Sequence, residues 1–327
     1  MKKFPVRVPH RGSKLLAVLC AAVFILLAVR TLWELQTLGK VINPARTGRY
    51  RIKNQFALLF PASDHDLFYT RVYNGMRDLA EQEQAALEIY EYPEGERDEI
   101  RKLLRLILNT QPNGVVFSVP PDPFYDDLFK AFLDRGIPLV SLEYDIAYRD
   151  VHVGTNPFEQ GRLAGEAALN LKSGGDMAVL LSGSNATFIQ GFRQILQERG
   201  VRDIGLIRSY DDTLAAGEEF IREILSFRTN ISVAVFTGSR ESEGAAQALI
   251  EYGRVGTPLI IAAEDNMEIR QLMELGVISA TIVRNPEKAG QAVIEALCAL
   301  LRDERTNAYV DSGSYVLSAE FVNQLPR

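Results

Sequence analysis

Short apolar segments alternate with amphipathic segments along most of this chain. Between residues 51 and 150 the apolar segments are rich in β-branched and aromatic residues, which is typical of strands. The segments between them repeat their apolar positions every three or four residues, as in IRKLLRLIL, which is typical of helices. The strands predicted here are Gln55–Phe60, Leu87–Tyr92, Gly114–Val119 and Ile137–Leu142, separated by helices at 68–84, 97–109 and 123–135.

The same alternation begins again after residue 156, following a short strand pattern at Val151–Val153. The strands predicted in this second half are Met177–Ser182, Ile204–Ser209, Ser232–Thr237, Pro258–Ala263, Ile278–Val283 and Tyr315–Val322. The predicted helices are 157–172, 187–199, 214–227, 241–252, 267–275 and 286–305. Strands separated by helices of this length indicate βαβ units and therefore parallel sheets. We predict an α/β fold with two halves of similar size.

The stretch between the two halves combines a polar strand end with a change of direction. Glu143-Tyr144-Asp145 follows the fourth strand, and Gly154-Thr155-Asn156-Pro157 opens the next helix. Open α/β sheets bind their ligands beyond the carboxyl ends of strands. We therefore predict that Glu143 and Tyr144 lie at a ligand edge and that residues 154–156 form a hinge.

The N-terminal segment has the pattern of a membrane anchor. Residues 1–14 carry five basic side chains and no acid, and Leu15–Val29 is an uninterrupted apolar run. Arg30 and Trp33 can extend this run to about 20 residues by placing their polar ends at the membrane surface. We predict a cytoplasmic N-terminus (1–14), a single-pass transmembrane signal anchor (15–36) and a stalk (37–50), with the remainder outside the cell membrane. A cleaved secretory signal is the alternative.

Charge and the reactive residue types exclude several classes of function. The 327-residue chain has a net charge of −6, whereas a nucleic-acid-binding protein requires a basic face. Cys20 and Cys298 lie in apolar patterns, so neither indicates a disulfide framework. With three histidines and no Cys/His cluster, we predict no metal site and no cofactor.

The motifs of common enzymes are absent from the sequence. There is no Gly-rich phosphate loop of the usual order and no GxSxG nucleophile elbow. His65, flanked by Asp64 and Asp66, is the one candidate for a catalytic base, and it supports a surface hydrolase as an alternative function. Because no nucleophile or metal ligands accompany it, we predict that the protein is not an enzyme.

Polar or aromatic residues follow most of the predicted strands. These positions include Asp66-Leu67-Phe68-Tyr69, Glu143-Tyr144, Asp211-Asp212, Ser239-Arg240, Glu264-Asp265 and Arg284-Asn285. Parallel strands bring all of these ends to one edge, where carboxylates, amides and aromatic faces suit a polyhydroxylated ligand. The acids among them also precede helices, so capping of helix N-termini is an open alternative for each one.

The order of these segments resembles the type I periplasmic sugar-binding proteins, in particular the ribose-binding-protein group. The resemblance covers residues 52–305. It rests on Asp66-Leu67-Phe68-Tyr69 with Asn74-Gly75, on Ile137–Glu143, on Val153–Asn156 with Gly161–Gly165, on Gly191-Phe192 and on Ala280–Ile282. It implies a two-lobed fold in which each lobe is a parallel sheet flanked by helices, here preceded by the transmembrane helix.

The resemblance also implies a set of ligand-binding residues. They are Asp66, Phe68, Tyr69, Glu143, Tyr144, Asp211, Ser239, Glu264 and Arg284, of which Phe68 and Tyr69 would stack on a sugar ring. Tyr144 stands where relatives usually hold arginine, Asp211 where they hold an aromatic residue and Arg284 where they hold glutamine. The arginine expected shortly before Gly191 is missing. These departures argue against ribose itself and indicate either a different pattern of hydroxyls on a sugar or polyol or a ligand that bears charge.

The implied lobes and hinges follow the strand pattern. The first lobe is 51–155 plus 285–311, and the second is 156–284 plus 312–327. Closure would occur at three crossings, at Thr155-Asn156, Arg284-Asn285 and Asp311-Ser312. A permanent tether favours a membrane-bound sensor that presents its ligand state to a kinase or other receptor. The alternative is the substrate-binding component of an ABC permease for sugars.

Overall fold

A computed structural model describes residues 52–62, 68–93, 95–171, 175–183, 185–201, 204–228 and 230–322. The residues from Ile52 onward form one compact unit. The predicted anchor (15–36) and stalk (37–50) lie outside the described residues. Within the described part of the chain, no helix is both long and apolar enough to cross a membrane.

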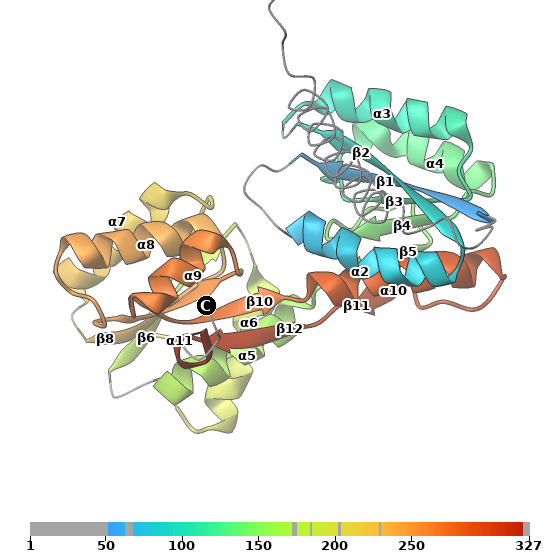
Figure 1. Cartoon of the computed structure of the whole chain (residues 1–327). Helices are drawn as coiled ribbons and strands as arrows, with labels where there is room; N and C mark the ends of the chain where they lie inside the picture. The colour runs from blue at the N-terminus through green and yellow to red at the C-terminus, as the bar shows by residue number, and fades with distance from the viewer. Residues whose placement is uncertain are drawn as a thin grey trace, which may run out of the picture. The chain divides into compact units, whose positions relative to one another are not determined.

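Six strands form the first sheet, here called sheet A. They are β1 (Asn54–Pro61), β2 (Ala85–Tyr92), β3 (Gly114–Phe117), β4 (Leu139–Leu142), β5 (Val151–Gly154) and β11 (Tyr309–Asp311). Their order is β11-β5-β4-β3-β1-β2, and every neighbouring pair is parallel (Figure 1). Right-handed crossovers through helices are the standard way to connect such strands.

Helices cover both faces of sheet A. They are α2 (Phe68–Gln82), α3 (Arg97–Thr110), the short 3₁₀ turn η1 (Pro123–Tyr125), α4 (Asp126–Asp134) and α10 (Pro286–Leu301). Because side chains alternate along a strand, Leu58 packs with α2 and α10, whereas Ala57 and Leu59 pack with α3 and α4. Burial on both faces explains why the inner strands β1 and β3 are nearly continuous apolar runs.

The second sheet, sheet B, repeats this architecture. Its strands are β6 (Asp176–Ser182), β7 (Leu206–Tyr210), β8 (Ile231–Phe236), β9 (Leu259–Ala263), β10 (Ile278–Arg284) and β12 (Ser314–Ser318), in the order β12-β10-β9-β8-β6-β7. Only β12, which pairs with β10, is antiparallel among its described strands. The helices are α5 (Pro157–Leu171), α6 (Ala186–Glu198), α7 (Leu214–Phe227), α8 (Ser239–Glu251), α9 (Met267–Glu274) and α11 (Ala319–Val322). The predicted pair of helix-flanked, mainly parallel sheets is confirmed.

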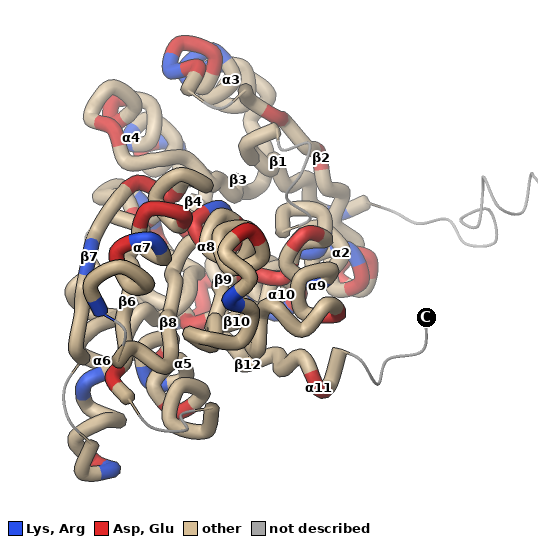
Figure 2. The backbone as a smooth tube through the Cα atoms, turned by 90° about the vertical axis from the view of Figure 1, so that its left-hand side faces the viewer, with Lys and Arg blue, Asp and Glu red and all other residues tan. Residues whose placement is uncertain are grey.

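Charge is absent from the central strands of both sheets. The central strands β3, β4, β8 and β9 contain no charged residue. Acidic and basic positions lie on the helices and loops, for example on α7 and α8 (Figure 2). Burying an unpaired charge between two helical layers would cost several kcal/mol (order of magnitude), which keeps these strands apolar.

Helix α2, which begins at the site residue Phe68, packs very closely against α10. A Cβ atom added to Gly75 would lie 2.1 Å from the carbonyl oxygen of Glu287, and one added to Gly290 would lie 2.1 Å from that of Val72. Side chains at these two positions would force the helices apart. The glycine pair therefore holds the first turn of α2 in register with the start of α10.

The chain passes between the two sheets at three places. Thr155 and Asn156 connect β5 to α5, Asn285 connects β10 to α10, and Ser312 follows β11. Backbone hydrogen bonds join these segments, since Ser312 N donates to Gly154 O (2.9 Å) and Asn285 N donates to Gly313 O (3.2 Å). The three predicted crossings coincide with these connections, and their action as hinges stays a prediction.

Two predicted elements differ from the structure, and one strand of the structure was not predicted. The strand expected at Tyr315–Val322 ends at Ser318, and Ala319–Val322 forms α11 instead. The helix expected at 286–305 ends at Leu301. Tyr309–Asp311 forms a strand that the sequence does not predict, because three residues are too few to show a period-2 pattern.

Candidate functional site

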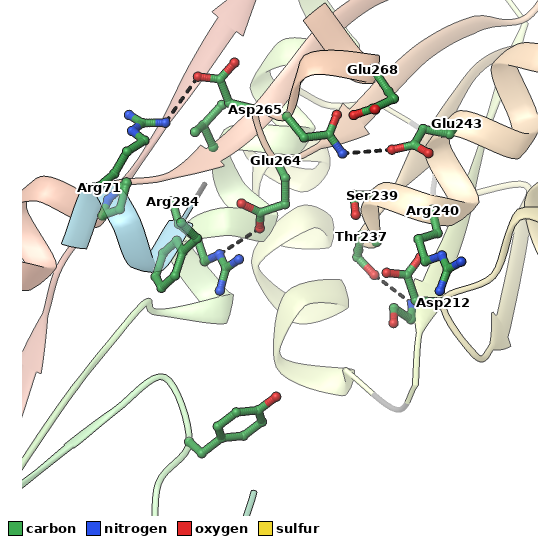
Figure 3. Close-up of a pocket in the computed structure, with 17 residues that line it drawn as sticks. Arg71, Asp212, Thr237, Ser239, Arg240, Glu243, Glu264, Asp265, Glu268 and Arg284 are labelled. Atoms are coloured by element: carbon green, nitrogen blue, oxygen red, sulfur yellow. Dashed lines mark hydrogen bonds and ion pairs between the residues drawn. The ribbon is translucent and has the colours of Figure 1, made fainter. Parts of the chain in front are cut away.

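A cavity of about 780 Å³ lies where the carboxyl ends of both sheets meet. We call it the main cavity. The residues that line it come from both lobes and include the crossing after β10: Phe68, Arg71, Tyr144, Ser182, Asp212, Thr237, Gly238, Ser239, Arg240, Glu243, Glu264, Asp265, Asn266, Glu268, Val283, Arg284 and Pro286 (Figure 3). The volume lies within the range of about 300–1,000 Å³ that is common for small-molecule sites.

Arg284, the last residue of β10, joins the two sides of the main cavity. Its Nη1 is 2.5 Å from Glu143 Oε2, and its Nε donates to Glu264 Oε1 at 2.7 Å. Burial alone would lower the pKa of Arg284, but the charges of Glu264 and Glu143 and their hydrogen bonds together raise it. Arg284 is therefore a permanent cation held between one carboxylate of each lobe.

Glu143 and Glu264 occupy equivalent positions at strand ends and share an unusual backbone conformation. Glu143 directly follows β4 and Glu264 directly follows β9, with φ angles of 64° and 70°. Non-glycine residues rarely adopt this left-handed region, and such outliers concentrate at functional sites. Glu143 Oε1 is buried and has no hydrogen-bond partner among the described residues. Within the described part of the chain, that oxygen is thus an unused acceptor next to Arg284, which lines the cavity.

Phe68 supplies the aromatic face of the cavity. It begins α2, and the guanidinium carbon of Arg284 lies 4.0 Å from the centre of its ring. This is cation–π geometry, which is worth about 0.5–2 kcal/mol. The phenyl ring thus holds Arg284 from one side while Glu143 and Glu264 hold it by hydrogen bonds.

Tyr69 supports Phe68 from behind and does not line the cavity. Its ring packs edge-on against Phe68 and stacks on Phe60, with centroid distances of 5.2 and 5.1 Å. Its hydroxyl is 2.8 Å from Ser118 Oγ. Burial is the main cause of a raised pKa for the Tyr69 hydroxyl, which therefore stays neutral.

The second-lobe wall of the main cavity is polar and mainly acidic. Asn266 donates to Glu243 Oε1 at 2.8 Å, and its Oδ1 accepts from Ile269 N, which caps α9. Desolvation raises the pKa of Glu243, and the negative charges of Glu268 and Asp212 add to this effect. A wall of this kind offers many acceptors to hydroxyl or ammonium groups of a ligand.

Glu241 lies immediately behind this wall and is fully buried. Its Oε1 accepts hydrogen bonds from Thr237 N (2.9 Å) and Gly238 N (2.8 Å), while its Oε2 has no partner among the described residues. Burial raises the pKa of Glu241 to about 8. The carboxyl therefore keeps its proton at neutral pH and fixes the loop that carries Ser239 and Arg240.

A second set of charges spans the cavity near α2. Arg71 donates to Glu287 Oε1 at 2.7 Å and lies 3.3 Å from Asp265 Oδ2. Asp265 also accepts from Arg270 at 2.5 Å. Hydrogen bonding to Glu287 is the largest cause of the raised pKa of Arg71. Arg71 and Arg270 are thus both neutralised by carboxylates of this protein.

The structure brings together most of the predicted ligand-binding residues. Phe68, Tyr144, Ser239, Glu264 and Arg284 line the main cavity, and Glu143 reaches it through Arg284. Tyr69 and Asp211 are not among the lining residues, and Asp66 lies outside the described residues. The roles of all these residues in ligand binding stay predictions.

Sequence reasoning missed several lining residues. Asp212 lines the cavity in place of its neighbour Asp211, and its Oδ1 accepts from Glu241 N at 2.9 Å. Arg71 could have been found because it lies three residues after Phe68 on one helix face. Glu243 could not have been predicted from the sequence, because no pattern distinguishes it from acids elsewhere on the surface.

Comparisons with known proteins agree with this architecture. The model of the periplasmic binding protein domain family matches residues 56–305. No curated protein sequence matches the chain closely enough to count as a relative.

Three solved structures illustrate the shared fold. A sugar-binding protein of a sugar ABC transporter from Bacillus halodurans has 20% sequence identity and a TM-score of 0.75, with 83% of this chain and 99% of that chain covered. AraP, an arabinose binding protein from Geobacillus stearothermophilus, has 22% identity and a TM-score of 0.75, with 84% and 99% covered. The structure titled XylFII-LytSN complex has 22% identity and a TM-score of 0.64, with 83% and 99% covered.

These similarities concern the fold, because the identities are low. The family match, by contrast, spans more than half of the chain and includes most strands of both sheets. The chain belongs to the periplasmic binding protein domain family.

Proposed function

We propose that this protein is an extracytoplasmic solute-binding protein that encloses a sugar or polyol in the main cavity and supplies it to an ABC permease. The observation that carries the proposal is that one cavity is lined by the aromatic rings of Phe68 and Tyr144 from one lobe and by the acceptor Glu264 from the other. A pyranose offers an apolar ring face and several hydroxyls, which such a site can hold together.

The similar structures support a sugar and a transporter. One is titled a sugar ABC transporter sugar-binding protein and another an arabinose binding protein. Our prediction from the sequence placed a tethered sensor first and a transporter component second. The comparisons favour the transporter component, and the predicted tether at 15–36 and the location outside the cell membrane remain part of the proposal.

A sensor is the second candidate, and one observation favours it. The fold is also similar to that of XylFII, which was solved as a XylFII-LytSN complex. The two candidates differ in the membrane protein that recognises the closed lobes. Capture of the full chain from membranes, followed by identification of its partners, separates them: permease subunits support the transporter and a kinase supports the sensor.

Ligand binding itself is tested by a thermal-shift screen of the full chain against pentoses, hexoses and polyols. A ligand that binds only the native state raises the unfolding temperature by mass action. We expect one class of sugar to give a shift that Phe68→Leu reduces strongly, since leucine keeps the apolar volume but removes the aromatic face. The control is Phe188→Leu, which alters an equally buried phenylalanine of α6 away from the cavity. A shift retained by Phe68→Leu, or no shift with any sugar, contradicts the proposal.

A further inference from the structure

A second cavity lies on the same edge of sheet A as the main cavity. It has a volume of about 440 Å³ and is lined by residues at the ends of β1 and β2 and after β3 and β4, among them Tyr92, Pro120, Pro121 and Tyr144. We call it the Tyr–Pro pocket. It therefore extends along the carboxyl edge of the sheet, where ligands of α/β proteins bind.

Tyr144 connects the Tyr–Pro pocket with the main cavity. It is the one described residue that lines both of them. It directly follows Glu143, whose carboxylate holds Arg284, and it is 40% exposed. A ligand group that leaves the main cavity along this edge would therefore meet the Tyr144 ring and then enter the second pocket.

The side chains of the Tyr–Pro pocket suit a sugar or aromatic ring. Tyr92 and Tyr125 use their hydroxyls internally, donating to Ser118 O (2.8 Å) and Arg97 O (3.2 Å), so that their rings contribute carbon surface. Pro120 and Pro121 add further apolar surface. Apolar ring surface packs against the CH face of a sugar or against a flat aglycone.

One ion pair adds polar groups to this apolar lining. Arg97 Nε lies 2.5 Å from Asp122 Oδ2, and both side chains line the pocket. The guanidinium of Arg97 stacks on Phe124 with 4.4 Å to the ring centre, and Asp122 also accepts from Phe124 N at 2.9 Å. Both groups are thus held in place before a ligand arrives, and a guanidinium with a carboxylate can bind neighbouring hydroxyls.

We propose that the Tyr–Pro pocket is a second subsite, which takes the adjacent ring of a disaccharide or an aryl glycoside whose first sugar lies in the main cavity. This inference rests on the proposed function, because the first ring must bind in the main cavity. It assigns to the protein a two-ring ligand, with Tyr144 packed at the junction of the rings.

Isothermal titration of the full chain with matched ligands tests the subsite. The ligands are D-xylose, L-arabinose, D-glucose and D-galactose, each compared with a disaccharide of the same unit and with its 4-nitrophenyl glycoside. We expect at least one two-ring ligand to bind about tenfold or more tightly than its monosaccharide, which corresponds to about 1.4 kcal/mol. Equal affinity for one-ring and two-ring ligands overturns the inference.

Two variants test whether the higher affinity for a two-ring ligand arises from the Tyr–Pro pocket. Pro121→Trp fills the pocket from an exposed position and should abolish the gain, while affinity for the monosaccharide stays within about twofold. Arg97→Ala should reduce the gain about threefold to tenfold by removing hydrogen bonds. The matched control is Arg101→Ala: Arg101 also stacks on Phe124 (4.6 Å) and pairs with an acid, Asp127, but does not line the pocket.

The outcomes separate the two proposals. A gain that persists in Pro121→Trp, or that falls equally in Arg97→Ala and Arg101→Ala, overturns the subsite and leaves the proposed function intact. If none of the one-ring or two-ring sugars binds the unaltered chain, the proposed function fails and the subsite fails with it. Retained monosaccharide binding shows that each variant is folded.

Discussion

At the carboxyl edge of sheet A the cavity-lining residues are largely aromatic or proline, whereas at the edge of sheet B they are hydroxyl, amide and carboxylate groups. Phe68 and Tyr144 represent the first edge, and Thr237, Ser239 and Glu243 represent the second. The strands behind both edges are alike, because each sheet is buried between two layers of helices. The difference shows that packing in the core requires apolar residues within the strands. The residues beyond the strand ends are not constrained in this way and can therefore differ between the two sheets.

The two edges meet at one charged cluster. Arg284 stacks on the aromatic side at Phe68 and bonds the carboxylates of Glu143 and Glu264, one from each sheet edge. The aromatic edge would hold the ring faces of a ligand, and the acidic edge its hydroxyls. We expect substitutions to affect stability most at the cluster and to affect ligand binding more selectively on either side of it.

The largest expected effect is that of Arg284→Ala. It leaves two largely buried carboxylates, with side-chain exposures of 12% and 28%, without their cation. We expect a loss of about 3 kcal/mol in the free energy of unfolding, measured by urea denaturation. The control is Arg240→Ala, which removes an exposed arginine that lines the same cavity and should change stability by about 0.5 kcal/mol or less. Equal losses for the two variants would contradict a bridging role for Arg284.

A smaller effect is expected behind the acidic edge, at Glu241. Its pKa is raised to about 8 in the folded protein, whereas an unfolded glutamate titrates near 4.5. The folded state therefore retains a proton that the unfolded state loses, and stability falls as pH rises from about 4.5 to about 8. Relative to Glu241→Gln, we expect the unaltered protein to lose about 2 kcal/mol between pH 5 and pH 6.5.

Urea denaturation at pH 5, 6.5 and 8 measures this difference. Glutamine can keep the acceptor for Thr237 N and Gly238 N, so the substitution mainly removes the titration. Glu251→Gln, at the exposed end of the same helix, serves as the control and should leave the pH dependence unchanged. Parallel pH curves for the unaltered protein and Glu241→Gln would show that Glu241 does not titrate in this range.

The smallest expected effect tests which of two adjacent aspartates at the edge of sheet B contacts the ligand. Asp212 lines the main cavity and its neighbour Asp211 does not. Asp212→Asn retains an acceptor for Glu241 N but removes a charge, and we expect it to weaken ligand binding by about threefold to tenfold. Asp211→Asn should leave the affinity unchanged in the same titration. Equal effects would indicate that the charge acts at long range and not by contact.

Most of the fold could be predicted from the sequence because the strands are sharply bounded apolar runs. Both sheets and all the long helices occur where the periodicity places them, within a few residues at each end. The misses share one physical cause. Tyr309–Asp311 is a strand because β5 offers it a free edge, and Ala319–Val322 is a helix although its pattern is also that of a strand. Such short segments take the structure that their neighbours permit.

The candidate site was only partly predictable for a different reason. Strand ends with acids or aromatics could be recognised, and they led to Phe68, Tyr144, Glu264 and Arg284. No pattern distinguishes Asp212 from Asp211, because which of two adjacent carboxylates faces a cavity depends on the local turn. Capping, too, could not be assigned in advance: Thr213 and Asn266 cap their helices, whereas the acid Asp265 pairs with arginines.

By itself, the sequence determined the two α/β halves and the residue types at the strand ends, since these follow from periodicity and chain order, whereas the positions of the three crossings came from the family resemblance. The tertiary structure alone decided which of those residues touch. Arg284 is more than 100 residues from Glu143 in the chain, and only the parallel arrangement of both sheets brings them to 2.5 Å. The Tyr–Pro pocket likewise exists only because four strand ends converge, so its aromatic and proline residues form a cavity that no local pattern shows.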